Sequence, residues 1–270
     1  MILLLDIGNT HTHAGLGGPR RVMRQWNLPT AQWADSRGGR PLERWLGQIR
    51  PTGVALCSVV PDATPRVREW LARKWGLPVL ELTARNVRGI GIDYPRPETI
   101  GPDRLANAIG ARARYGAPVL IVDFGTAVTL DVLDSRGNYV GGVIAPGLAA
   151  MTDYLHERTA LLPRIRIRDI RRAIGRSTEE AMLVGAVHGY RGLIRELIRE
   201  VKAELRVRRC PVVATGGYAR LLARGLPEID AVDPNLTLEG LRRFFGSECP
   251  DPHLTSHGRE SGASPRTPRH

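Results

Sequence analysis

Two aliphatic strands in this chain each end on an aspartate and a small turn, and this repeat constrains the fold more than any other feature. The first unit reads ILLLDIGNT (residues 2–10) and the second reads VLIVDFGT (residues 119–126). The first unit alone fits an ordinary β-hairpin, since Gly and Asn suit tight turns. A turn needs no carboxylate at the end of a buried strand, however, and this chain has one twice. Two such units facing each other could bind a polyphosphate through backbone N–H groups and its metal through the carboxylates.

Length and hydrophobicity predict a globular protein. The 270 residues, 42% of them hydrophobic, suffice for one large domain or two of ordinary size. No apolar run reaches the roughly 18 residues of a membrane span, and no basic region precedes the short apolar start, so we expect neither a membrane partner nor a signal peptide. Three distant cysteines (Cys57, Cys210 and Cys249) form no CxxC pair, which predicts reduced thiols and a cytoplasmic location.

The formal charge of +12 and the pI near 10.6 are typical of proteins that bind nucleic acids. Arginine supplies nearly all of this charge, because Lys74 and Lys202 are the only lysines. The arginines are spread along the chain and are densest at 164–172. We attribute the charge to a compositional bias and predict no nucleic-acid partner, although such a surface would attract an anionic substrate.

Strand-like and helical patterns are mixed along the chain, which predicts an α/β protein. Strand-like runs lie at 2–6, 53–60, 79–82, 118–123, 127–133 and 210–214. Helical patterns lie at 63–75, 102–114 and 177–205, and the last begins with a capping box, Ser177-Thr-Glu-Glu180. The segment 86–102 reads as a long loop, a kind of segment that is often functional.

Six sequence blocks occur in one order: DIGNT (6–10), CSVVP (57–61), GPDR (101–104), DFGTAVTLD (123–131), GGVIAPG (141–147) and TGG (215–217). Together they resemble the type III pantothenate kinases of the actin-like kinase superfamily. The resemblance runs from residue 1 to about 246. It implies two actin-like (ribonuclease H-like) domains of mixed sheet plus helices, 1–116 and 117–247, with an active-site cleft between them. Residues 248–270 lack apolar periodicity and are predicted to be a disordered tail.

The resemblance implies an enzyme that uses ATP to phosphorylate pantothenate to 4'-phosphopantothenate, the first step of coenzyme A biosynthesis. It also implies a homodimer that needs Mg²⁺ and a monovalent cation, K⁺ or NH₄⁺. The absence of a Walker A motif fits phosphate binding by paired hairpins. Two alternatives stay open: another small-molecule kinase on the same scaffold, because a fold does not fix the acceptor, or a non-catalytic regulatory relative.

The resemblance assigns nucleotide and cation roles to both hairpins. Asp6 is the expected electrostatic partner of Mg²⁺, through water, and Asp123 matches the monovalent-cation position. TGG (215–217) fits close passage of the adenosine moiety, although it also fits a plain glycine-rich turn. His11 and His13 resemble a zinc pair, but a third ligand is lacking, and we do not predict zinc. The predicted ATP-binding residues are Asp6, Ile7, Gly8, Asn9, Thr10, His11, Thr12, His13 and Thr126.

The general base predicted from the resemblance is Asp103, since phosphoryl transfer needs one residue to receive the hydroxyl proton. The alternative is that Asp103 only stabilises the first turn of a helix through the helix dipole. Pro102 departs from the small residue usual in the family and cannot donate an N–H. Thr178 matches a contact that can reach across the dimer. The predicted substrate-binding residues are Tyr94, Gly101, Pro102, Asp103, Arg104 and Thr178.

The tail is predicted to be dispensable, because residues beyond Glu248 lack the apolar pattern of a packed segment. A chain ending at Glu248 should keep the melting temperature and the kinase activity of the full chain. A large loss of either, measured on the two chains side by side, would show that the tail docks on the folded part.

Overall fold

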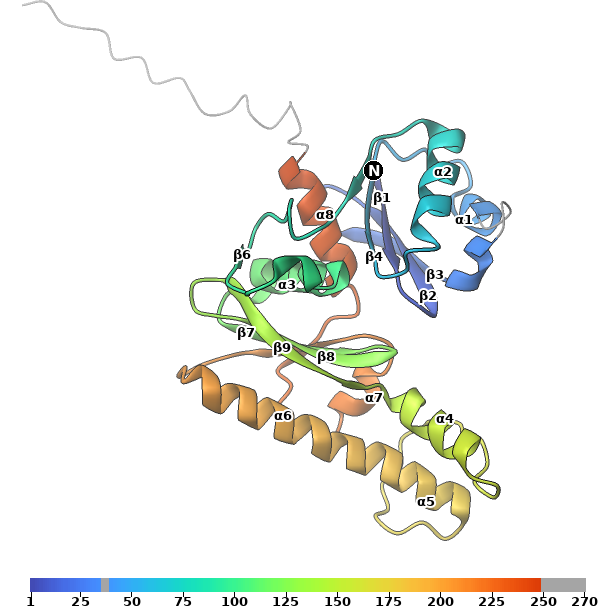
Figure 1. Cartoon of the computed structure of the whole chain (residues 1–270), viewed down its shortest axis with the longest axis vertical. Coiled ribbons are helices and arrows are strands. Elements are labelled where there is room, and N and C mark those ends of the chain that lie inside the picture. Colours follow the sequence, from blue (N-terminus) through green and yellow to red (C-terminus); the bar gives the residue numbers. More distant parts are fainter. Residues whose placement is uncertain (35–38, 249–270) are drawn as a thin grey trace, which may run out of the picture.

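The computed structural model describes residues 1–34 and 39–248, and its strands form two mixed β-sheets (Figure 1). The strand order is β3-β2-β1-β4-β5 in the first sheet and β11-β10-β7-β8-β9-β6 in the second. The strands of the first sheet are β1 (Ile2–Ile7), β2 (His11–Gly17), β3 (Val22–Pro29), β4 (Val54–Ser58) and β5 (Val79–Glu81). Those of the second are β6 (Gly91–Ile92), β7 (Val119–Phe124), β8 (Ala127–Leu133), β9 (Asn138–Pro146), β10 (Val212–Thr215) and β11 (Ala231–Val232).

The two sheets repeat one arrangement of strands. Strand β1 is antiparallel to β2 and parallel to β4, and β7 is likewise antiparallel to β8 and parallel to β10. A further antiparallel strand, β3 or β9, flanks each hairpin, and a further parallel strand, β5 or β11, lies on the other side. The predicted fold of two related halves of mixed sheet and helices is therefore confirmed.

The helices agree with the predicted ranges where the sequence showed a clear period. They are α1 (Gly39–Leu46), α2 (Thr64–Trp75), α3 (Pro102–Tyr115), α4 (Leu148–Arg158), α5 (Thr178–Val184), α6 (Tyr190–Leu205), α7 (Ala219–Ala223) and α8 (Leu236–Glu248), with 3-10 turns η1 (Thr30–Ala34) and η2 (Pro97–Thr99). The long helix predicted at 177–205 is interrupted by a π-helical turn, η3 (Gly185–Gly189), between α5 and α6. Ser177 caps it as predicted, since its Oγ accepts the N–H of Glu180 at 3.1 Å.

Helices α3 and α8 cross between the two sheets (Figure 1). Helix α3 contacts β7 and β8 of the second sheet and β4 of the first, and α8 contacts β1, β2, β3 and β4 of the first. Glycines make this crossing close: a Cβ on Gly240 would lie 1.8 Å from the carbonyl oxygen of Ala106, and one on Gly110 would lie 2.5 Å from that of Leu236. The chain thus returns at its C-terminal end to the first sheet, so the division at residues 116 and 117 stays a prediction.

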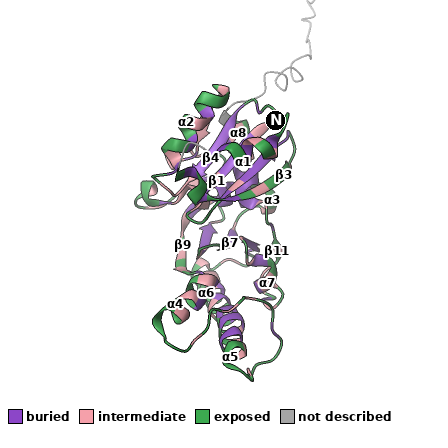
Figure 2. Ribbon diagram, turned by 90° about the vertical axis from the view of Figure 1, so that its right-hand side faces the viewer, coloured by how far each residue is buried: buried purple, intermediate pink, exposed green. Residues whose placement is uncertain are grey.

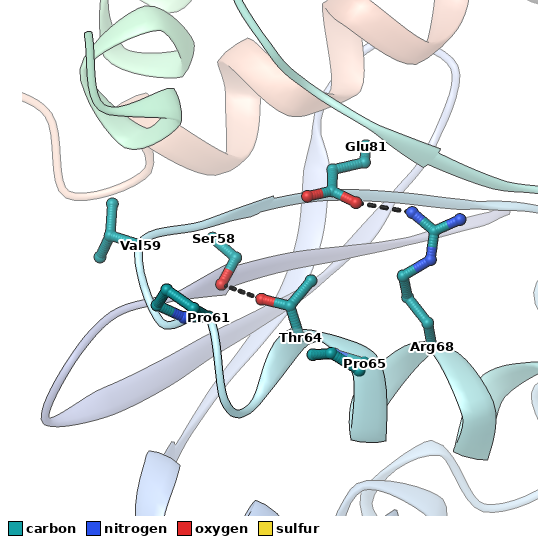
Figure 3. A pocket seen from close by; sticks show the side chains of 7 residues that line it. All are labelled: Ser58, Val59, Pro61, Thr64, Pro65, Arg68 and Glu81. Atoms are coloured by element: carbon teal, nitrogen blue, oxygen red, sulfur yellow. Dashed lines mark hydrogen bonds and ion pairs between the residues drawn. The ribbon is translucent and has the colours of Figure 1, made fainter. Parts of the chain in front are cut away.

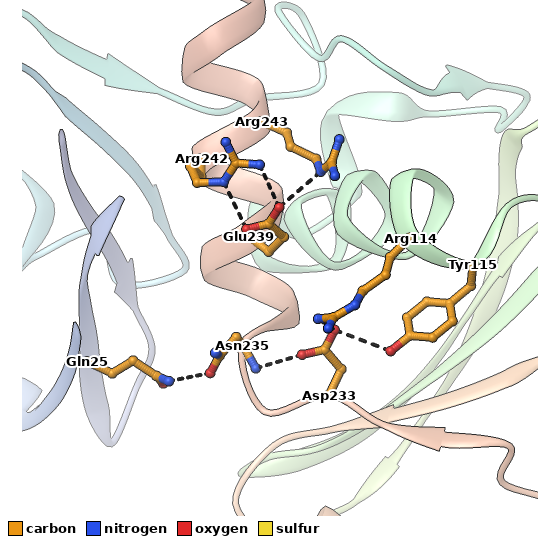
Figure 4. Close-up of polar contacts among 8 residues, drawn as sticks. All are labelled: Gln25, Arg114, Tyr115, Asp233, Asn235, Glu239, Arg242 and Arg243. Atoms are coloured by element: carbon orange, nitrogen blue, oxygen red, sulfur yellow. Dashed lines mark hydrogen bonds and ion pairs between the residues drawn. The ribbon is translucent and has the colours of Figure 1, made fainter. Parts of the chain in front are cut away.

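Polar side chains hold the start of α8 between the two halves, as Figure 4 shows. Arg114, near the end of α3, donates to Asp233 at 2.7 Å. Asp233 in turn accepts the backbone N–H of Asn235 at 3.1 Å, and Gln25 on β3 donates to the Asn235 side chain. This network joins β3, α3 and the residues that lead into α8.

Hydrophobic burial is concentrated in the strands and in the helix faces that cover them (Figure 2). One cluster lies between the sheets, and it contains Leu4, Ile121 and residues of α3 and α8 such as Leu105 and Leu241. Cys57 and Cys210 are buried free thiols, and Cys249 and the predicted tail lie outside the described residues. Within the described ranges, no helix is long and apolar enough to cross a bilayer.

The close α3–α8 crossing predicts that Gly240→Ala destabilises the fold. The new methyl group would meet backbone atoms of Ala106, which cannot move aside like a flexible side chain. We expect a loss of about 1–3 kcal/mol in the free energy of unfolding, measured by urea denaturation. Gly246→Ala is the matched control on α8, because its Cβ would meet nothing within 4 Å and Ala favours a helix. Equal stabilities of the two variants would contradict the close crossing.

Candidate active site

The first hairpin turn is braced by residues that follow β3. Gly8 N–H donates to the carbonyl of His11 at 3.0 Å and closes the turn between β1 and β2. Thr30 supports it twice: its hydroxyl donates to the carbonyl of Gly8 at 2.6 Å, and its N–H donates to that of Thr10 at 3.0 Å. The buried hydroxyl of Thr12 is 3.1 Å from that of Thr30. Neither Thr30 nor this bracing role of Thr12 was predicted from the sequence.

The second hairpin turn, between β7 and β8, meets the first. The hydroxyl oxygens of Thr10 and Thr126 lie 3.1 Å apart, although the two residues are 116 positions apart in the chain. Gly147, in the GGVIAPG block, packs against this turn so closely that a Cβ would lie 2.2 Å from the carbonyl oxygen of Thr126. The structure therefore brings the two predicted phosphate hairpins face to face.

Acidic residues gather behind these turns. Asp6 and Asp123 lie near the ends of β1 and β7, Asp103 is the second residue of α3, and Asp131 lies on β8. Burial, with the nearby charges of Asp103 and Asp123, raises the pKa of Asp6 to about 7. Burial also raises the pKa of Asp123 to about 6 and raises that of Asp103. The charges of Asp103 and Asp123 thus make ionisation of Asp6 harder, and those of Asp103 and Asp131 do the same at Asp123.

Among the described residues, Asp131 is the one carboxylate of these four that forms an ion pair with arginine. Arg104 Nε lies 2.7 Å from Asp131 Oδ1, which also accepts a hydrogen bond from Tyr139 at 2.7 Å. The guanidinium of Arg104 lies over the Tyr139 ring, and Tyr94 contacts that ring edge-on. The adjacent Gly142 leaves room, since its Cβ would lie 2.9 Å from Arg104. Arg104 and Tyr94, both predicted substrate residues, are therefore neighbours.

The residues at this site fit a bound cation. In the described part of the chain, Asp6, Asp103 and Asp123 form no ion pair, and burial raises the pKa of all three. No group of three or more His, Cys, Asp or Glu side chains in the described ranges is arranged to hold a metal directly. A cation that keeps most of its water shell, as Mg²⁺ does, requires no such cage.

Thr178 lies apart from the carboxylates, whereas His13 is the cross-strand partner of Asp6 in the β1–β2 pair. Thr178 is the exposed first residue of α5, and Figure 1 shows α5 at the opposite end of the second half from α3. His11 is exposed, whereas His13 Nε2 lies 3.0 Å from Gln25 Oε1. Burial lowers the pKa of His13.

The CSVVP block forms the turn from β4 to α2. Ser58 Oγ accepts the N–H of Val60 at 3.1 Å and the hydroxyl hydrogen of Thr64 at 2.6 Å. The turn borders a pocket of about 700 Å³, shown in Figure 3, whose other side carries the ion pair of Arg68 with Glu81. Since Ser58 pairs with Ile7 across the strands, this pocket lies beside the first hairpin.

The glycine turn at 215–217 lies against Asp123. Thr215 on β10 pairs with Asp123 on β7. Gly216 adopts φ +89°, which favours glycine, and a Cβ there would lie 2.5 Å from Asp123 Oδ1. The turn needs glycine here both for its backbone angle and for this close approach.

Comparisons with known proteins agree in one family. A sequence model of the family described as type III pantothenate kinase matches residues 2–200. The type III pantothenate kinase of Akkermansia muciniphila is 48% identical over 245 residues, which cover 90% of this chain and 98% of that protein. That of Methylacidiphilum infernorum is 43% identical over 245 residues, covering 89% and 86%. The solved inorganic polyphosphate/ATP-glucomannokinase of Arthrobacter sp. has a similar fold, with a TM-score of 0.50, 14% identity and coverage of 92% and 99%.

The raised pKa of Asp6 predicts a pH-dependent gain from Asp6→Asn. In the folded state Asp6 keeps its proton up to about pH 7, whereas the unfolded chain releases it near pH 4, so wild-type stability falls as pH rises through this window. Asparagine does not ionise, so the variant does not lose this stability as the pH rises. Without Mg²⁺, the variant should therefore gain on the order of a few kcal/mol over wild type at pH 8 and little at pH 4.5.

Urea denaturation at both pH values measures this difference. Asp62→Asn is the control, because it removes the same formal charge from an exposed position in the β4–α2 turn. A gain for Asp6→Asn that is the same at both pH values would contradict a native carboxyl group that resists ionisation.

Proposed function

We propose, because this chain belongs to the type III pantothenate kinase family, that it transfers the γ-phosphoryl group of ATP to the primary hydroxyl of pantothenate. The product is 4'-phosphopantothenate, in coenzyme A biosynthesis. The main structural support for this proposal is the 3.1 Å contact of Thr10 with Thr126, since it joins two hairpins suited to one polyphosphate. The buried free thiols Cys57 and Cys210 support a cytoplasmic location.

In this proposal, the hairpins hold the phosphates of ATP. Residues 6–13 and Thr126 supply backbone N–H groups and hydroxyls, and the turn at 215–217 passes the adenosine moiety. Mg²⁺ would be held near Asp6 through water and a monovalent cation at Asp123, and these ions neutralise charge on the transferred phosphoryl group. The uncompensated carboxylates at both positions support this assignment.

Asp103 is the proposed general base. It begins α3, its Oδ1 accepts the N–H of Arg104 at 2.9 Å, and burial raises its pKa. A carboxylate whose pKa is raised toward neutral pH is a better acceptor for the hydroxyl proton. Gly101 must be small here, because a Cβ would lie 2.5 Å from Asp103 Oδ1.

Pantothenate would lie between Asp103 and the side chains of Tyr94 and Arg104. A carboxylate group of the substrate would suit the guanidinium of Arg104. Pro102 is the first residue of α3, a position that suits proline, and its nitrogen carries no hydrogen. We therefore assign no backbone donor to Pro102, in contrast to Gly101 before it.

A homodimer would give Thr178 a place at the site of a second copy. Apolar side chains are exposed on β9, on α4 and on the segment between α4 and α5, which leads to Thr178. Burying them against a second copy would remove apolar surface from water. They are Ile144, Met151, Tyr154, Leu155, Leu161 and Ile174.

Asp103→Asn should reduce kcat by about 10²–10⁴-fold with nearly unchanged ATP affinity, because asparagine keeps the size of the side chain but cannot accept the proton. A coupled assay for ADP release, with and without pantothenate, measures both constants. Glu98→Gln, an exposed neighbour in η2, is the control. If Asp103 served only the helix dipole, the variant would show a lower melting temperature and a near-normal kcat.

A further inference from the structure

Asn107 on α3 connects the site to α8, and none of the predicted roles includes it. It lies one helical turn after Asp103, so both side chains share a face of α3. Its side chain is only 1% exposed. A buried amide without partners would be costly, and Asn107 has a partner at each end.

The two hydrogen bonds of Asn107 link Thr237 to Asp123, with each residue donating to the next. The Thr237 hydroxyl on α8 donates to Asn107 Oδ1 at 2.7 Å, and Asn107 Nδ2 donates to Asp123 Oδ2 at 2.8 Å. A hydroxyl that donates to the amide oxygen leaves the amide NH₂ to face the carboxylate, which only accepts when ionised. Thr237 therefore fixes which way the amide of Asn107 points.

The hydrogen bond from Asn107 uses Oδ2 of Asp123 and leaves Oδ1 for a ligand. In the described part of the molecule, the hydrogen bonds of Asp123 run through Oδ2. Oδ1 faces the turns at Gly216 and Gly125, where a Cβ would lie 2.5 and 3.6 Å away. The Asp123 carboxylate is held through Oδ2 by Asn107, and Gly216 and Gly125 lie close to Oδ1. Oδ1 therefore points in a fixed direction.

We infer that Asn107 and Thr237 are positioning residues of the active site, which act by holding Asp123 in the orientation that binds the monovalent cation. This rests on the proposed function, in which Asp123 is the cation position. The two positioning residues come from α3 and α8, so the helix crossing contributes to cation binding as well as to stability. Neither residue contacts the reacting atoms.

The first test compares Thr237→Val with Thr237→Ser in the full chain. Valine removes the hydroxyl at similar size, and serine keeps it. Thr237→Val should raise the K⁺ concentration for half-maximal activity about three- to tenfold, the effect of one lost hydrogen bond, with KM for ATP within about twofold of wild type. Thr237→Ser should restore the wild-type value. Thr152→Val, which removes a buried hydroxyl bonded within its own helix α4, is the control.

The second test uses Asn107→Leu and a measurement without turnover. Removing the donor to a charged carboxylate should raise the K⁺ requirement about ten- to a hundredfold. It should also abolish the difference in melting temperature between KCl and NaCl at equal ionic strength, which wild type and Thr237→Ser should both show. If Asn107→Leu does not fold, the Thr237 pair carries the test.

The outcomes separate the inference from the proposed function. A wild type without pantothenate-dependent ADP release would overturn the proposed function. An active wild type whose rate and melting temperature do not distinguish K⁺ from Na⁺ would overturn the inference. It would also be overturned if Thr237→Val and Asn107→Leu lost only stability, with the wild-type K⁺ requirement.

Discussion

Uncompensated negative charge at the meeting point of the two halves is the constraint on which the rest of this structure depends. Burial raises the pKa of Asp6, Asp103 and Asp123, the charge of Asp103 raises that of the other two further, and Arg104 forms its ion pair with Asp131. Folding brings these groups together at a cost in free energy, since each would ionise more easily in the unfolded chain. A bound cation reverses that cost, so the arrangement is unfavourable for the empty protein and favourable for a metal–nucleotide complex.

Helix α3 connects these carboxylates to the hydrophobic core. Within two turns it supplies Asp103, the arginine that pairs with Asp131, and the amide of Asn107 that holds Asp123. The same side of the helix packs closely on α8, through Gly110 and through the hydrogen bond of Asn107 with Thr237. Because α8 packs on the first sheet and α3 contacts both, the helix pair connects the two sheets that carry the hairpins.

The sequence predicted what depends on local patterns and missed what depends on distant contacts. Both strand-Asp-turn units, α2, α3 and the cap at Ser177 are local features and were predicted. Strands β3, β6, β9 and β11 and helices α1, α4 and α8 were not, because their place in the fold depends on contacts with distant parts of the chain. The resemblance to a known family supplied the base, Asp103, and the cation position, Asp123, whose roles are still proposals.

Asn107 and Thr30 illustrate why the rest of the site escaped prediction. Each is an ordinary polar residue in the sequence, and each acquires a role only from a partner that the fold brings near. The partner of Asn107, Thr237, is 130 positions away, and the partner of Thr30, Gly8, is 22 positions away. No pattern of composition or spacing around either residue marks such a contact.

The repeat is not symmetric in chemistry, and the difference follows from the neighbours of its two aspartates. Asp6 pairs with Cys57 on the adjacent parallel strand, and that thiol is a weak donor at 3.4 Å. Asp123 instead receives an amide hydrogen bond from Asn107. Burial raises the pKa of both residues, but the amide hydrogen bond lowers that of Asp123, whereas the charges of Asp103 and Asp123 raise that of Asp6 further. The same position in two copies of one fold therefore has two different donors, and the amide at Asp123 stabilises an ionised carboxylate more strongly than the thiol at Asp6 does.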